Sequence, residues 1–176
     1  LSYAYRVARF FDAEMLNDVK KALPFTHLPD EEMFSEDRLL KDGDTLQIDE
    51  LRWEVIHTPG HTAGEVSILD KASRTLFSGD TANVGIILMR QPDNGTVLIE
   101  ECNRTMGKLW AMEASFDRLG VGHDEVTISK QIVKDYYDLT CGLLDGSIVG
   151  AYEETGFRKG DVARLGMAEL WYQCDA

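Results

Sequence analysis

The chain is poor in the residues that mark several classes of protein. Its 176 residues include only three cysteines, Cys102, Cys141 and Cys174, with no Cys-x-x-Cys pair. An odd number at wide spacing argues against a disulfide framework and favours a reducing compartment, so we expect a cytoplasmic protein. No apolar run approaches the roughly 20 residues that cross a bilayer, so we expect no membrane partner.

Positive charge is scarce as well. Lysine and arginine number 18 against 31 aspartates and glutamates, which gives a formal net charge of -13. A strongly acidic surface repels phosphate backbones, so we expect no nucleic-acid partner, and a nuclease is disfavoured. Apolar material is not scarce, because 44% of the residues are hydrophobic, which is enough for a core. We predict a single domain over residues 1–176.

Histidine is rare too, and the complete set is His27, His57, His61 and His123. His57 and His61 stand four apart, which is the spacing of a metal-binding pair on a helix. Pro59 and Gly60 lie between them and forbid a helix there. We therefore predict that His57 ends a strand over residues 51–57 and supports a turn. His61 is then expected just beyond the end of that strand.

A carboxylate reaches the same region from the following strands. Apolar runs at residues 65–69 and 75–77 are separated by a turn at 70–73, and Asp80 follows the second run. Imidazole and carboxylate at neighbouring strand ends suit a divalent metal such as zinc, iron or manganese, and a carboxylate can bridge two ions. Considered alone, a His and an Asp about twenty positions apart are more often ordinary polar residues than metal ligands.

Three short motifs, taken in order, resemble the metallo-β-lactamase superfamily. They are TPGHTAG at residues 58–64, FSGDT at 77–81 and Gly-His at 122–123, with a hairpin between the first two. The resemblance implies an α/β fold, a metallo-β-lactamase-like αββα sandwich. It also implies two divalent metal ions, zinc first, with iron or manganese as alternatives. In that arrangement His61 binds one metal, Asp80 bridges both as the catalytic carboxylate, and His123 completes the second.

The chain departs from the family pattern upstream of these motifs. The family's His-x-His-x-Asp-His signature is missing, because no two histidines here are separated by one residue. Since the chain also begins at Leu1, we expect the C-terminal portion of the fold, supplying mainly the second β-sheet and its helices. The missing N-terminal segment of the same protein is then an expected partner. Zinc usually takes about four ligands, so three side chains cannot complete a two-metal centre.

The function implied by the resemblance is metal-dependent hydrolysis of a small-molecule substrate. A metal-bridging hydroxide would attack an ester, thioester, lactone or β-lactam carbonyl. Two alternatives stay open, an iron-dependent oxidoreductase of the same superfamily and a non-catalytic relative that is incomplete without the signature motif. The fold does not decide among these functions. A homodimer is also left open.

Periodicity and turn residues predict the remaining elements. A turn at residues 41–44 precedes an antiparallel pair of strands at 45–48 and 51–57. Gly120 is predicted to stop a long helix, and residues 121–124 to form a short strand and loop. Helices are expected at residues 10–23, 100–119, 130–144 and 161–171, and a loop at 150–160.

Overall fold

The computed structural model describes residues 40–88, 90–91, 95–96, 99–123, 127–155 and 158–172. Contacts divide the chain into two units, Leu1–Leu39 and Leu40–Ala176, and every described residue belongs to the second. The helix predicted at residues 10–23 lies outside the described residues, as do His27 and Cys174. The single domain expected over residues 1–176 stays a prediction.

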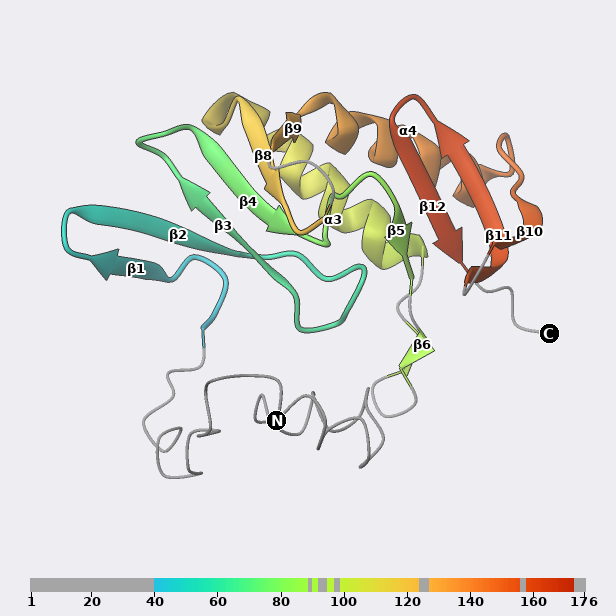
Figure 1. Cartoon of the computed structure of the whole chain (residues 1–176), viewed down its shortest axis with the longest axis horizontal. Coiled ribbons are helices and arrows are strands. Elements are labelled where there is room, and N and C mark those ends of the chain that lie inside the picture. The colour runs from blue at the N-terminus through green and yellow to red at the C-terminus, as the bar shows by residue number, and fades with distance from the viewer. Residues whose placement is uncertain are drawn as a thin grey trace, which may run out of the picture. The chain divides into compact units, whose positions relative to one another are not determined.

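Six strands form the larger sheet (Figure 1). In spatial order they are β1 (Thr45–Ile48), β2 (Leu51–His57), β3 (Val66–Asp70), β4 (Thr75–Gly79), β8 (Arg118–Val121) and β9 (Thr127–Ser129). Neighbouring strands are antiparallel except β4 and β8, which are parallel. The predicted strands at 45–48 and 51–57 are confirmed with their bounds. The turn predicted at 41–44 is confirmed as well, because the Asp44 amide donates to the Lys41 carbonyl over 3.0 Å.

A second sheet is built mostly from the end of the chain. Its order is β10 (Ala151–Thr155), β11 (Arg158–Leu165), β12 (Ala168–Tyr172) and β5 (Ile86–Ile87). Only β12 and β5 are parallel in it, so both sheets are mixed. The short strands β6 (Arg90–Gln91) and β7 (Gly95–Thr96) pair with each other. The loop predicted at 150–160 and the helix predicted at 161–171 are therefore wrong.

A turn at Gly166 explains why the helix prediction failed. Val162, Leu165 and Leu170 fit helical spacing, but Gly166 has φ 58 and divides them between two strands. A Cβ at position 166 would lie 2.3 Å from Asp135 Oδ2, so the turn needs glycine for its space and for its backbone angle. The hairpin that results buries Leu170 in the core.

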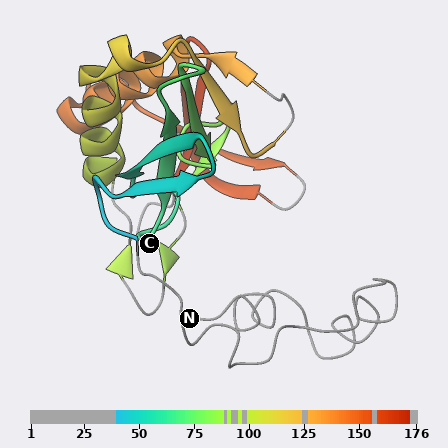
Figure 2. The ribbon, with the colours of Figure 1, turned by 90° about the vertical axis from the view of Figure 1, so that its left-hand side faces the viewer.

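Two helices pack side by side against these sheets. They are α3 (Ile99–Ala111) and α4 (Gln131–Asp145), and Figure 2 shows both on the same side of the larger sheet. The core joins helix residues with residues of the larger sheet; among them are Cys102, Met106, Leu109, Ile132, Tyr136, Ile56, Leu69, Leu76 and Leu119. The helix predicted at 130–144 is confirmed within one residue at each end. Among the residues that the structure describes, no helix is long and apolar enough to cross a membrane.

The helix predicted at residues 100–119 ends earlier than expected. Helix α3 stops at Ala111, a 3-10 turn occupies Glu113–Ser115, and β8 begins at Arg118. Leu119 pairs with Leu76 of β4, and Gly120, predicted as a helix stop, lies inside β8. A helical period at Leu119 was compatible with the sequence, but pairing with a strand distant along the chain decides its structure.

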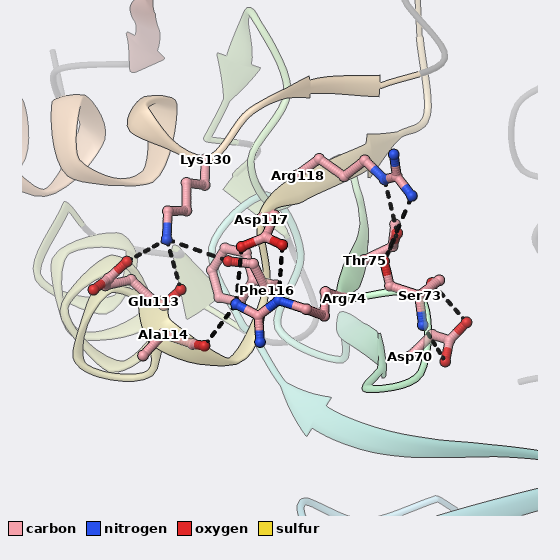
Figure 3. A network of polar contacts seen from close by, with 10 residues as sticks. All are labelled: Asp70, Ser73, Arg74, Thr75, Glu113, Ala114, Phe116, Asp117, Arg118 and Lys130. Carbon is pink, nitrogen blue, oxygen red and sulfur yellow. Dashed lines mark hydrogen bonds and ion pairs between the residues drawn. The ribbon is translucent and has the colours of Figure 1, made fainter.

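Polar contacts fix the path of the chain from α3 into β8 (Figure 3). Arg74 donates to both carboxylate oxygens of Asp117, from Nε over 2.7 Å and from Nη2 over 2.8 Å. Lys130, directly before α4, donates to the carbonyls of Glu113 and Phe116 over 2.9 and 3.3 Å. These contacts hold the turn that leads into β8 and on to the predicted Gly-His pair.

Candidate metal centre

The first motif forms a loop that His57 supports from the end of β2. The His57 amide donates to Asp42 Oδ1 over 2.7 Å, and its ring Nε2 donates to the Ala63 carbonyl over 3.1 Å. The Thr58 amide donates to the Glu65 carbonyl over 2.9 Å, which closes the base of the loop. The prediction that His57 sits in the strand and supports the turn is confirmed.

His61 lies in this loop with one ring nitrogen already engaged. Its Nδ1 is 2.7 Å from the carbonyl oxygen of Ile87 in β5. A carbonyl only accepts hydrogen bonds, so Nδ1 carries the proton, and the neutral ring keeps its lone pair at Nε2. Histidines that bind metals usually donate their other ring N–H in this way. No local pattern predicts the contact with Ile87, because β5 joins the other sheet.

Asp80 follows β4, and its side chain lies against that of His123. Asp80 Oδ1 lies 3.1 Å from His123 Nε2 at ion-pair distance, although no donor in the described chain makes a geometrically sound hydrogen bond to this buried oxygen. Gly122 allows the approach, because a Cβ there would lie 2.9 Å from Asp80 Oδ1. The Gly122 amide also donates to the Gly79 carbonyl over 3.2 Å, which ties the two loops together.

Buried hydroxyl groups join the loop that carries His61 to the loop that carries Asp80. Thr58 Oγ1 lies 3.0 Å from Ser67 Oγ and 3.0 Å from Thr81 Oγ1. Thr105 of α3 donates to the Pro59 carbonyl over 2.5 Å, which fixes the turn against the helix. Hydroxyl groups near the two motifs therefore hold the loop of His61 and the loop of Asp80 together, and α3 supports the first loop.

Glu65 is a residue of this region that the sequence interpretation missed. Burial, followed by the nearby charge of Asp80, raises the pKa of Glu65 from 4.5 to about 7. Hydrogen-bond donors at Thr62, Thr81 and Asp80 oppose this change. Glu65 Oε2 is buried and has no hydrogen-bond partner in the described structure. Its one sign in the sequence is its position between the TPGHTAG motif and the strand at Val66–Asp70.

The donors fit part of a metal centre. Over the described residues, two buried carboxylate oxygens, Glu65 Oε2 and Asp80 Oδ1, have no hydrogen-bond partner, and His61 uses Nδ1 for its contact with Ile87. A cation is the partner that such a set favours. Over the described residues, however, no three His, Cys, Asp or Glu side chains converge closely enough to hold one ion. The structure brings Asp80 and His123 together and does not complete a site with His61, so the two-metal centre stays a prediction.

Curated proteins with similar sequences are hydrolases. The chain is 33% identical over 70 residues to an acyl-coenzyme A thioesterase, MBLAC2, of Gallus gallus, a match that covers 39% of this chain and 25% of that protein. It is 51% identical over 45 residues to a hydroxyacylglutathione hydrolase of Brucella anthropi, covering 26% of this chain and 17% of that protein. The chain thus spans a quarter or less of the length of these relatives.

Comparison with solved structures and with family sequence patterns agrees with these relatives. A metallo-beta-lactamase from Staphylococcus aureus superposes with a TM-score of 0.53 at 16% identity, over 64% of this chain and 41% of that one, which shows the fold alone. The sequence pattern of the Metallo-beta-lactamase superfamily matches residues 5–132, well over half of the 176 residues. The chain belongs to the metallo-β-lactamase superfamily.

Proposed function

We propose that the protein is a metal-dependent hydrolase of a small molecule with an activated carbonyl, and that the bond it hydrolyses is a thioester. The observation that carries the proposal is the meeting of Asp80 and His123 beneath Gly122, on the family's own motifs. The curated relatives add support, because one is named as an acyl-coenzyme A thioesterase and another as a hydroxyacylglutathione hydrolase. Ester, lactone and β-lactam substrates remain the alternatives within the same chemistry.

The residues of this chain have separate tasks in the proposed reaction. Two divalent ions, which we propose to be zinc, would draw ligands from His61, Asp80 and His123 and the remaining ligands from a preceding segment, and they would supply a water of pKa about 7 as the nucleophile. The Ile87 carbonyl fixes the orientation and tautomer of His61. The absence of a side chain at Gly122 lets His123 lie against Asp80. Because these groups are already held in position, the site needs little reorganisation during the reaction.

We propose further that the larger sheet is one half of the family's sandwich. Val55, Ile68 and Phe77 are partners across β2, β3 and β4, so they share one face of the sheet. Their chain neighbours Ile56 and Leu76 point the other way, into the core with the helices. This second apolar face suits a second sheet, which a preceding segment of the same protein would supply together with the remaining metal ligands.

The test is metal content together with thioester hydrolysis, measured on the purified protein including any preceding segment. His61→Ala and Asp80→Ala are expected to lose most bound metal and to lower kcat/KM at least a hundredfold. Asp138→Ala, on the exposed side of α4, serves as the control and should change neither. Unchanged metal in both site variants would refute the assignment. Bound iron together with oxygen consumption would favour the iron-dependent oxidoreductase. The absence of any bound metal would favour the non-catalytic relative.

A further inference from the structure

A cavity of about 320 Å³ opens beside His123. One wall is the segment of Asn83, Val84 and Gly85, and the opposite wall is the turn between β11 and β12. Ligand pockets commonly measure about 300–1,000 Å³, so this cavity is sized for a small group. Because His123 also contacts Asp80, the cavity adjoins the candidate metal centre.

Two charged side chains that line the cavity, Arg164 and Glu169, are paired with each other. Arg164 lines it, and all three guanidinium nitrogens donate to carboxylates: Nε to Glu169 over 2.7 Å, Nη1 and Nη2 to Glu153 over 2.7 and 2.9 Å. One cation between two carboxylates leaves this cluster with a net negative charge. An anionic group would therefore be repelled here rather than bound.

Apolar side chains provide part of the remaining surface that the described residues contribute, beside the polar Asn83 and His123. Val84 and Met167 line the cavity from opposite walls and are 40% and 41% exposed, although both are apolar. Ala168 and two glycines of the lining, Gly85 and Gly166, add no polar side chain. Covering this surface with an apolar group would be favourable, at about 25 cal/mol per Å².

The hydroxyl of Tyr136 holds the two walls at a fixed separation. It lies 2.8 Å from the Asn83 carbonyl and 2.9 Å from the Glu169 carbonyl, and it accepts from the Ile86 amide over 3.1 Å. Tyr136 itself is fully buried in α4, so the link between the walls is supported by the core. The cavity is thus a built feature rather than a gap between mobile loops.

We infer that this cavity binds an uncharged apolar group of the substrate, namely the short acyl chain next to the scissile carbonyl. The identity of the group as an acyl chain rests on the proposed hydrolase function. The binding of a neutral apolar group rests only on the cavity. The substrate class is therefore a short-chain acyl ester or thioester whose acyl part carries no charge.

Binding is tested without turnover, by NMR of protein labelled with ¹³C in its methionine methyl groups. The probes are hexanamide and hexanoate, which differ in charge and share one chain. Hexanamide is expected to shift the Met167 methyl signal, assigned with Met167→Leu, and to bind at least tenfold more tightly than hexanoate. Binding of hexanoate that is as tight as that of hexanamide, or no shift of Met167 with hexanamide, would overturn the inference.

Two matched variants locate the binding. Val84→Phe fills the cavity and should weaken hexanamide binding at least tenfold. Val149→Phe makes the same change at a valine that is 84% exposed outside the cavity lining, and should leave binding unchanged. Hexanamide binding without any thioester hydrolysis would remove the proposed function and leave the cavity assignment standing. Thioester hydrolysis with an acyl-chain preference that Val84→Phe does not alter would overturn the cavity assignment and leave the proposed function standing.

Discussion

Among the described carboxyl groups, Glu65 has an environment that opposes its charge near neutral pH. Its pKa of about 7 lies above the ordinary 4.5, so folding is favoured by protonation. The resulting stability is fully present below about pH 4.5 and is lost as the pH rises through about 7. We predict that Glu65→Gln, in metal-free protein, removes this pH-dependent loss of stability. Urea unfolding at several pH values between these limits and above them would measure it.

The control for this prediction is Glu100→Gln, at an exposed glutamate in the first turn of α3. That variant should keep the pH dependence of the wild type. A Glu65→Gln curve that follows the wild type between these pH values would contradict the prediction. A divalent ion beside Asp80 would stabilise the charged form of Glu65, so metal should reduce the difference between wild type and Glu65→Gln.

The motif residues show how much of the candidate site could be predicted from the sequence. Local patterns sufficed for His57 and placed Asp80 at a strand end, since turns and strand ends are set by neighbouring residues. The pairing of Asp80 with His123 came from the family resemblance and not from any local pattern. Glu65 and Ile87 were missed because their contacts depend on segments that only the folded sheets bring together.

Between elements, Lys130 links the start of α4 to the backbone that leads into β8. It donates to the carbonyls of Glu113 and Phe116, and it forms an ion pair with the Glu113 carboxylate. Hydrogen bonds to a charged group contribute about 1.5–3 kcal/mol when the group is not fully exposed. We predict that Lys130→Ala lowers the free energy of unfolding by about 2 kcal/mol, measured by urea denaturation.

A second lysine of the same region gives the control. Lys134 pairs with Asp138 one turn further along α4, and its contact is a side-chain pair on the helix surface. Such pairs contribute about 0.3–0.5 kcal/mol, so Lys134→Ala should cost far less than Lys130→Ala. Equal losses in the two variants would mean that the carbonyl contacts of Lys130 add nothing.

The elements themselves divide into those with local signals and those without. Strands β1 to β4 were predictable, because each is bounded by a turn and joined to its neighbour by a short connection. Strand β8 was not, because it pairs in parallel with β4 across an intervening helix. Strands β11 and β12 were taken for a helix because apolar residues at Val162, Leu165 and Leu170 fit both periods, and only the turn at Gly166 separates them.

At the scale of the whole chain, the second face of the larger sheet is covered unevenly. Val55, Ile68 and Phe77 lie in one row, and Val55 is fully buried whereas Phe77 is 45% exposed although it is a large apolar residue. The Phe77 ring packs over Gly120, where a Cβ would lie 2.7 Å from Phe77 Cδ1. In an αββα sandwich this row would face a second sheet, so a change there should act differently with and without that sheet.

We predict that Phe77→Ser costs about 3 kcal/mol of unfolding free energy in a protein that includes the proposed preceding segment, because a buried phenylalanine contributes about that much. In the 176-residue chain the same change should cost less than half of this value and should reduce binding of a hydrophobic dye. Leu144 is also 45% exposed but lies on α4, so Leu144→Ser is the matched control and should cost the same in both proteins. Equal costs for Phe77→Ser in the two proteins would mean that no second sheet packs on this face, because an added sheet must remove further apolar area from water at that position.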